Sequence, residues 1–135
     1  MTKLLGPYIA IAFVAFLLGS CGKGGCNIVP NVSFQKTVSQ GSHPDLFRPG
    51  GWVYSEGGVC GLIVYNNAGN VIAYDRCSTV NIGQRNQVKV NGFEVIDDVS
   101  GAKWLLLDGS PSHIAECHLK PYHVSKNGNF YSISN

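Results

Sequence analysis

The segment from Cys60 to Cys77 constrains the fold most, because it has the pattern of a two-stranded antiparallel hairpin. Its two arms, CGLIVY and VIAYDRC, are rich in β-branched and aromatic residues, and the turn between them is built from Asn, Ala and Gly. If Asn66 faces Val71, the same register places Cys60 directly opposite Cys77. The sequence therefore predicts a hairpin that carries a cross-strand cysteine pair.

Three interpretations of Cys77 are open on the sequence alone. A disulfide with Cys60 would close a short loop and stabilise the domain by up to roughly 3 kcal/mol in the chain-entropy model. The two thiols could instead form a metal or redox pair. An enzyme with Cys77 as nucleophile would need a nearby base, for which His43 and His113 are the candidates. The register favours the disulfide, and no catalytic residue is assigned.

The rest of the chain is also divided into short segments by turn residues. A strand is expected over residues 32–38, a short strand ending in a turn within 52–58, and a buried strand followed by a turn within 102–109. Hairpins are expected over 87–96 and 118–134. Residues 39–51 are dense in helix and strand breakers and are expected to form a loop. With 17 Gly and 6 Pro among 135 residues and no long segment of helical period, an all-β single domain is predicted.

The N-terminus has the pattern of a lipoprotein signal peptide over residues 1–20. A positive charge at Lys3 precedes an apolar run that is shorter than the roughly 20 residues needed to span a membrane. The run ends in Leu-Gly-Ser before Cys21, which resembles the lipobox of bacterial lipoproteins. The alternative is an ordinary signal peptide with a cysteine nearby.

Lipidation at Cys21 predicts where the protein acts. A lipid anchor would hold it on a membrane of the bacterial cell envelope, with the outer membrane as the expected one, and residues 21–31 would form a tether. That compartment permits disulfides. The net charge of +2, without a cluster of Lys and Arg, excludes nucleic acid as a partner. The membrane is the one partner predicted, and any protein or small-molecule partner stays unidentified.

The C-terminal half resembles the Rieske fold, and most closely the Rieske-like lipoproteins of Bacteroidetes-type bacteria. The segments VIAYDRC, WLLLDGSP and LKPYHVSKNGNFYSIS follow one another in the order and spacing of that family. Its tail motif matches at Leu119, Lys120, Tyr122, Val124, Gly128 and Ile133. The resemblance implies a Rieske-like β domain over residues 32–135. Stacked antiparallel sheets would form a small sandwich or barrel base, with a former cluster-binding subdomain inserted at about 74–115.

The family's metal ligands carry over poorly to this sequence. A Rieske [2Fe–2S] cluster is bound by two thiolates and two imidazoles. The resemblance places Cys77, Thr79, Asp97 and Ser100 at these four positions, so three of the four ligands are replaced. We therefore expect a degenerate site and no bound cofactor. The alternative is a [2Fe–2S] electron-transfer protein with unusual ligation.

Other polar residues give weaker signals. Cys117 and His118, together with His113, are a poor match to a four-ligand zinc site, so no metal is predicted there. Cys117 could pair with Cys26 instead. The expected function is that of a non-enzymatic binding or structural module of the envelope.

Two pairs of adjacent charged residues complete the predictions. The adjacent carboxylates Asp97 and Asp98 are expected in a solvated turn, and Asp75 is expected to form a local ion pair with Arg76.

Overall fold

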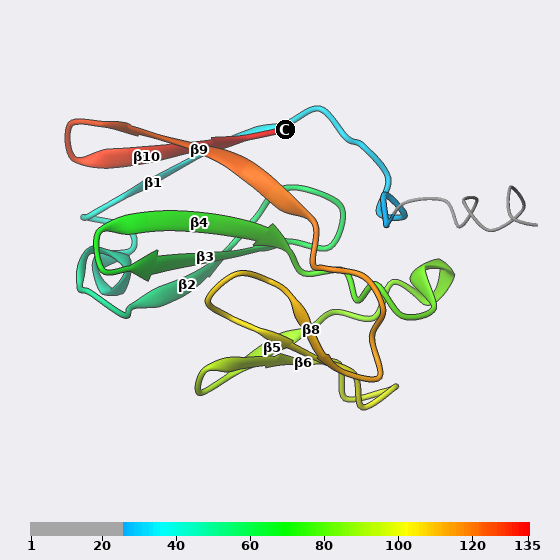
Figure 1. The fold of residues 1–135 in the computed structure, drawn as a ribbon. Coiled ribbons are helices and arrows are strands. Elements are labelled where there is room, and N and C mark those ends of the chain that lie inside the picture. Colours follow the sequence, from blue (N-terminus) through cyan, green and yellow to red (C-terminus); the bar gives the residue numbers. More distant parts are fainter. Residues whose placement is uncertain (1–25) are drawn as a thin grey trace, which may run out of the picture.

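The computed structural model describes residues 26–135, which form two antiparallel β-sheets (Figure 1). The predicted signal peptide, residues 1–20, and the predicted lipidation site, Cys21, lie outside the described residues. Within the described range, no helix has the length and apolar character needed to cross a membrane. The predicted all-β class is confirmed.

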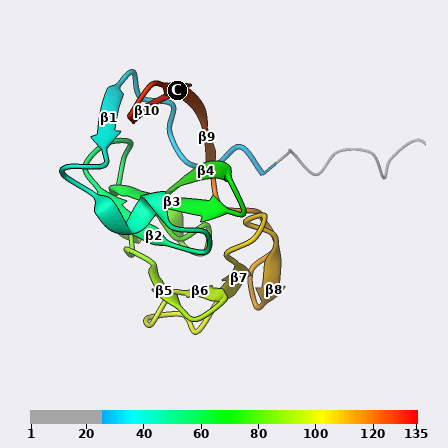
Figure 2. The same cartoon turned by 90° about the vertical axis from the view of Figure 1, so that its left-hand side faces the viewer.

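The larger sheet has six strands and curls into an open half-barrel (Figure 2). In spatial order it contains β1 (Gln35–Ser39), β10 (Phe130–Ser134), β9 (Pro121–Asn127), β4 (Asn70–Asp75), β3 (Leu62–Asn67) and β2 (Trp52–Ser55). The smaller sheet contains β5 (Lys89–Asn91), β6 (Glu94–Ile96), β7 (Lys103–Leu105) and β8 (Pro111–His113). Two short 3-10 helices, η2 (Pro44–Phe47) and η3 (Ile82–Gln84), lie in loops. The smaller sheet is thus an insertion between β4 and β9.

The hairpin of β3 and β4 has the predicted register. Asn66 pairs with Val71, and the ladder continues to Leu62 opposite Asp75. The loop consists of Ala68 and Gly69, both with positive φ, 50° and 96°. Positive φ at both central residues is the requirement of a type I′ turn, whose twist matches that of the strands. The turn therefore fixes which residues face each other at the far end of the hairpin.

Strand β3 is buried on both faces because it lies between two hydrophobic cores. Leu62 and Val64 face the interior of the half-barrel, whose other buried members are Val38, Leu46, Val71, Ala73, Tyr122, Tyr131 and Ile133. Ile63 and Tyr65 face the smaller sheet and pack with Tyr74, Val88, Val95, Ala102, Trp104, Leu106 and Leu119. The continuous apolar run in the sequence is the expected pattern for a strand covered on both sides.

Some predicted boundaries were wrong. The first strand begins at Gln35, three residues later than expected. The strand and the turn predicted within 102–109 are both present, but the strand is only β7, and Leu107 in the turn is 55% exposed. The sequence also missed η2, η3 and β8, which are too short to show a period. A bulge between Lys103 and Trp104 breaks the pairing of β7 with β8.

Asn66 joins η2 to the half-barrel from a buried position. Its side-chain Nδ2 donates to the carbonyl of Leu46 at 2.9 Å, and its Oδ1 accepts from the backbone N–H of Gly69 at 2.7 Å. The side chain therefore supports both the hairpin turn and the loop that covers the half-barrel. A buried amide with both ends bonded is costly to replace, since its partners would lose their hydrogen bonds.

We predict that Asn66→Ala lowers the free energy of unfolding by about 1–3 kcal/mol, because it leaves the Leu46 carbonyl and the Gly69 N–H unpaired. Urea denaturation measures the change. The neighbouring Asn67 forms no side-chain hydrogen bond within the described residues, so Asn67→Ala is the matched control and should change stability by less than about 0.5 kcal/mol. An equal loss in both variants would contradict this role of Asn66.

Candidate functional site

A buried carboxylate, Asp75, organises the end of the hairpin. Its side chain is fully shielded from solvent. Oδ1 accepts from the backbone N–H groups of Cys60 at 3.0 Å and Cys77 at 2.9 Å. Oδ2 accepts from the Val59 N–H and the Tyr122 hydroxyl, both at 2.6 Å. An ionised carboxylate accepts about four hydrogen bonds, so Asp75 is saturated by the protein itself.

The expected ion pair between Asp75 and Arg76 is wrong. All four donors to Asp75 come from Val59, Cys60, Cys77 and Tyr122, and the Arg76 side chain is turned elsewhere. Alternation along a strand sends neighbouring side chains to opposite faces, which explains why residues adjacent in sequence do not meet.

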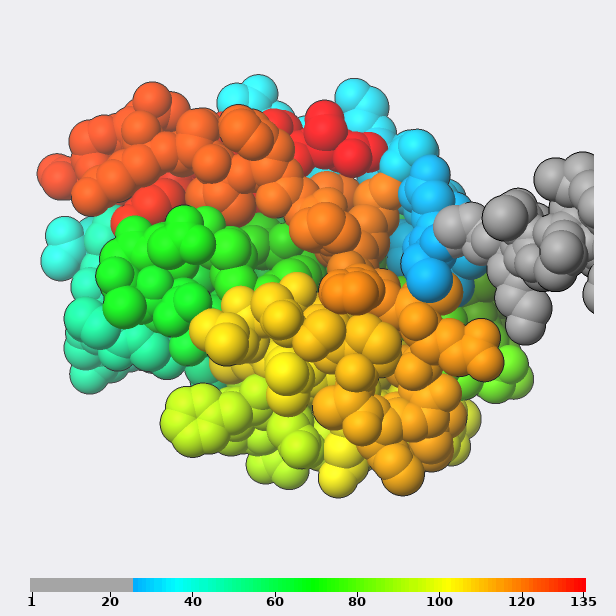
Figure 3. All heavy atoms as spheres, viewed as in Figure 1, coloured from blue at the N-terminus to red at the C-terminus, as the bar shows by residue number. Residues whose placement is uncertain are grey.

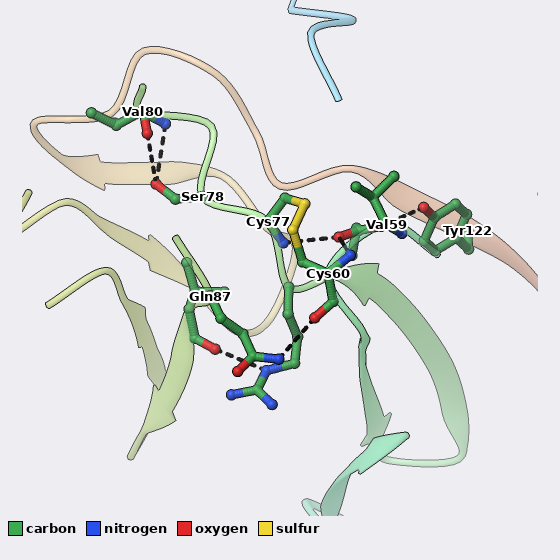
Figure 4. Close-up of a disulfide and its surroundings, with 10 residues drawn as sticks. Val59, Cys60, Cys77, Ser78, Val80, Gln87 and Tyr122 are labelled. Carbon is green, nitrogen blue, oxygen red and sulfur yellow. Dashed lines mark hydrogen bonds between the residues drawn. A yellow bond between two sulfur atoms is a disulfide. The ribbon is translucent and has the colours of Figure 1, made fainter. Parts of the chain in front are cut away.

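A disulfide joins Cys60 to Cys77 across the end of the hairpin, with Val59 and Tyr122 on one side and Gln87 on the other (Figure 4). The Cα atoms of the two cysteines are 5.0 Å apart. The Arg76 N–H donates to the Gly61 carbonyl, so the ladder continues past β3 and β4 in the register that the turn set. The sulfur of Cys77 is therefore bonded to the sulfur of Cys60, and Cys77 is fully buried.

Tyr122 closes the site from β9. Burial raises the pKa of its hydroxyl above the ordinary value, and the hydrogen bond to Asp75 raises it further, so the hydroxyl stays a proton donor. Gly58 leaves room for this contact, with φ at +62°. A Cβ there would lie 2.8 Å from the Tyr122 hydroxyl and against Asp75. The loop before Cys60 thus depends on a glycine that the sequence patterns did not single out.

Thr79, at the first predicted imidazole position, is bonded to the chain itself. Its hydroxyl donates to the carbonyl of Cys117 at 2.8 Å. The indole Nε1 of Trp104 donates to the same carbonyl at 2.8 Å. Two side chains from the inserted region therefore bind one backbone oxygen of the loop that follows β8.

Asp97 and Ser100, at the other two cluster positions, bind each other. The Ser100 hydroxyl donates to Asp97 Oδ2 at 2.7 Å, and the Val99 N–H donates to Oδ1 at 2.9 Å. Burial alone would raise the pKa of Asp97, but hydrogen bonds from the Ser100 hydroxyl and from two backbone N–H groups hold it below its ordinary value. Asp97 is 1% exposed, so the expected solvated turn is wrong for this residue.

Asp98, by contrast, points to solvent and pairs with Lys89 at 2.7 Å. The two adjacent carboxylates therefore have different environments. The sequence could not separate them, because the position of each relative to the protein interior depends on the turn between β6 and β7.

The residues at the four cluster positions do not fit a [2Fe–2S] group. Such a cluster takes thiolate and imidazole ligands, whereas Thr79, Asp97 and Ser100 offer oxygen. Cys77 is the one residue of the four whose side chain could supply a thiolate, and its sulfur is bonded to Cys60. The oxygen atoms of Thr79 and Ser100 also serve as hydrogen-bond donors within the protein.

A second group of ligand-type atoms lies at the disulfide. One atom each of Cys60, Asp75 and Cys77 lie within 4.8 Å of one another. Metal binding there would require reduction of the disulfide, and it would compete with the four hydrogen bonds that Asp75 already accepts. Sequence reasoning found the two cysteines but assigned Asp75 to an ion pair with Arg76 and so missed its role here, since a single Asp at a strand end is usually a surface residue.

The second disulfide joins Cys26 to Cys117, the pairing left open by the sequence, with Cα atoms 5.1 Å apart. Figure 3 shows the first described residues, in blue, lying against the orange segment that contains Cys117. This bond removes the thiol from the set of Cys117, His113 and His118 that was weighed as a zinc site. His113 lies in β8 and is exposed, as is His118, which lies outside any strand.

Comparison with known proteins identifies the architecture. No protein family matches the sequence, and neither does any curated protein. Among solved structures, a chain from the complex of reduced oxygenase and oxidised ferredoxin in carbazole 1,9a-dioxygenase is 16% identical, with a TM-score of 0.55. The match covers 74% of this chain and 92% of that one. The fold is Rieske-like.

A second structure supports this fold. The ferredoxin of carbazole 1,9a-dioxygenase from Nocardioides aromaticivorans is 13% identical with a TM-score of 0.51, and the match covers 76% of this chain and 97% of that chain. The Rieske-like arrangement predicted from the order of motifs is therefore confirmed at the level of the fold.

We predict that Asp75→Asn lowers the free energy of unfolding by at least about 3 kcal/mol, because an amide replaces one acceptor oxygen by an N–H₂ group facing two donors. Urea denaturation in the oxidised state measures the loss. Asp98→Asn is the control, since it removes an exposed carboxylate and should cost less than about 1 kcal/mol. Similar effects of the two substitutions would contradict the role given to Asp75.

A second prediction concerns acid stability. Because the pKa of Asp97 is lowered on folding, its contribution is present above the ordinary value of 3.8 and is lost as the pH falls through the lower folded pKa. Ser100→Ala removes the strongest of its hydrogen bonds, so the loss of stability with falling pH should become shallower than in wild type. Urea denaturation between about pH 2 and pH 7 measures the slope.

The control for the acid prediction is Ser112→Ala, at an exposed serine of β8. It should reproduce the wild-type dependence of stability on pH. An unchanged slope in Ser100→Ala would show that the Asp97 network does not govern the acid limb.

Proposed function

We propose that the protein is a lipid-anchored module of the bacterial cell envelope with a Rieske-like domain that no longer carries a cluster and acts by binding or by structural support, without catalysis. The observation that carries this proposal is the use of all four former ligand positions in the protein's own bonds. Cys77 is bonded to Cys60, Thr79 to a backbone carbonyl, and Asp97 to Ser100. Nothing at these positions is left to hold two irons.

The position of Cys26 supports the anchoring part of the proposal. It follows Cys21 by five residues and is bonded to Cys117 in the body of the domain. Five residues span at most about 18 Å when fully extended. A lipid on Cys21 would therefore hold the inserted region close to the membrane surface instead of on a long flexible tether.

The decisive experiment asks whether the protein binds iron and sulfide. We expect the full-length chain, purified in non-ionic detergent and then reconstituted with ferrous iron and sulfide under reducing conditions, to stay colourless and free of stoichiometric iron. The matched positive control is a variant with Cys60→Ser, Thr79→His, Asp97→Cys and Ser100→His, which restores two thiolates and two imidazoles. Iron analysis and electron paramagnetic resonance of the reduced samples give the readout.

A [2Fe–2S] signal in the wild-type protein would establish the alternative, electron transfer with unusual ligation, and reject the proposal. The anchoring part is tested separately. Mass spectrometry of the N-terminal peptide should find acyl chains on Cys21, and Cys21→Ser should release the protein from the membrane fraction.

A further inference from the structure

A groove beside the disulfide is lined by several polar side chains. It has a volume of about 530 Å³ and lies between the side chain of Arg76, the end of β2 and the segment that leads from β1 to η2. Lys36, His43, Ser55, Glu56 and Arg76 contribute its polar lining. The groove adjoins a wider one of about 880 Å³. The two share His43 and Tyr54, and the wider one also contains Trp52.

Arg76 is held rigidly at the wall of this groove. Its Nε donates to the Val88 carbonyl at 2.9 Å, and its guanidinium carbon lies 3.7 Å from the centre of the Tyr54 ring. The Tyr54 hydroxyl accepts from the Val90 N–H at 2.9 Å, so the ring beneath the guanidinium is itself fixed. These contacts use the Nε–H and one face of the Arg76 guanidinium, and they leave its two terminal NH₂ groups available as donors.

The positive charge in the groove is not balanced by the protein. Within residues 26–135, no carboxylate forms an ion pair with Arg76 or Lys36. Burial lowers the pKa of Arg76, which is the effect of an incompletely solvated charge, and the nearby Tyr54 hydroxyl acts in the opposite sense. Glu56 is the one carboxylate lining the groove, and it is exposed.

We propose that this groove binds a small ligand that carries an oxyanion, carboxylate or phosphate, on a sugar-like ring. Arg76 would bind the oxyanion through its fork of N–H donors, with Lys36 adding charge. The ring would extend into the adjoining groove against Trp52, whose ring centroid lies 4.9 Å from that of Tyr54, because the guanidinium of Arg76 already covers a face of Tyr54. This inference rests on the proposed function as a binding module and names its ligand class.

Isothermal titration calorimetry of the full-length oxidised protein in non-ionic detergent tests the proposal. The probes are glucuronate for a carboxylate, glucose 6-phosphate for a phosphate, and glucose as the neutral control. We expect binding of at least one anionic sugar and none of glucose. Which anion binds identifies the source of the oxyanion. Absence of heat with both anionic sugars would overturn the inference.

Single substitutions localise the site. Arg76→Lys keeps the positive charge but loses the paired N–H donors of the guanidinium, so it should weaken binding about tenfold. Lys36→Gln should also weaken binding, whereas Glu56→Gln should strengthen it by removing a like charge. Lys126→Gln lies outside the groove and is the matched control for loss of one positive charge. Weakening by Lys126→Gln equal to that by Lys36→Gln would overturn the site.

Two further measurements separate the possible failures. Thermal unfolding of Arg76→Lys checks that the variant is folded, and the Lys36→Gln and Glu56→Gln results do not depend on that variant. Iron content is measured on the same protein. Iron-free protein that binds neither anion would reject the groove but not the proposed function, whereas protein with a [2Fe–2S] cluster would reject the proposed function.

Discussion

The hydrogen bonds to the buried carboxylate of Asp75 are the interaction on which the rest of the structure depends. One side chain receives N–H groups from the loop before β3 and from Cys77, two residues after the end of β4, and a hydroxyl from β9. Because the carboxylate is fully buried, water cannot replace these donors. A buried acceptor of this kind fixes geometry because each alternative arrangement leaves donors unpaired.

The two disulfides then connect this centre to the inserted sheet and to the N-terminus. The Cys60–Cys77 disulfide closes the hairpin at the point where the chain leaves the half-barrel. The Cys26–Cys117 disulfide joins the first described residue to the loop between β8 and β9, in which the chain returns to the half-barrel. The smaller sheet has short strands, and its core is shared with β3 and β4. A sheet of this size gains much of its order from covalent links and from its contact with the larger one.

The hairpin could be predicted from sequence because its information is local. An Asn- and Gly-rich turn sets the register, and the register then determines which cysteines face each other. The surroundings of Asp75 and Asp97 could not be predicted in this way. Both residues are bonded to groups contributed by tertiary structure or by a turn of particular geometry, and the sequence shows only an acidic residue at a strand end. For the same reason Gly58, which leaves room for the contact between Tyr122 and Asp75, gave no signal.

The cluster position that the Rieske resemblance implies at Cys77 and the groove meet at the end of the hairpin. In a cluster-binding arrangement, the thiol of Cys77 would be needed as a ligand. Here that sulfur is bonded to Cys60, which fixes the backbone of the adjacent residue, Arg76. The N–H of Arg76 donates to the Gly61 carbonyl, and its side chain lines the groove. The bond that makes the Cys77 sulfur unavailable as a ligand therefore also positions the guanidinium of Arg76 at the groove. Under the proposed function, the fold would keep its rigid scaffold while the donors offered to a ligand lie beside the disulfide and not at a metal.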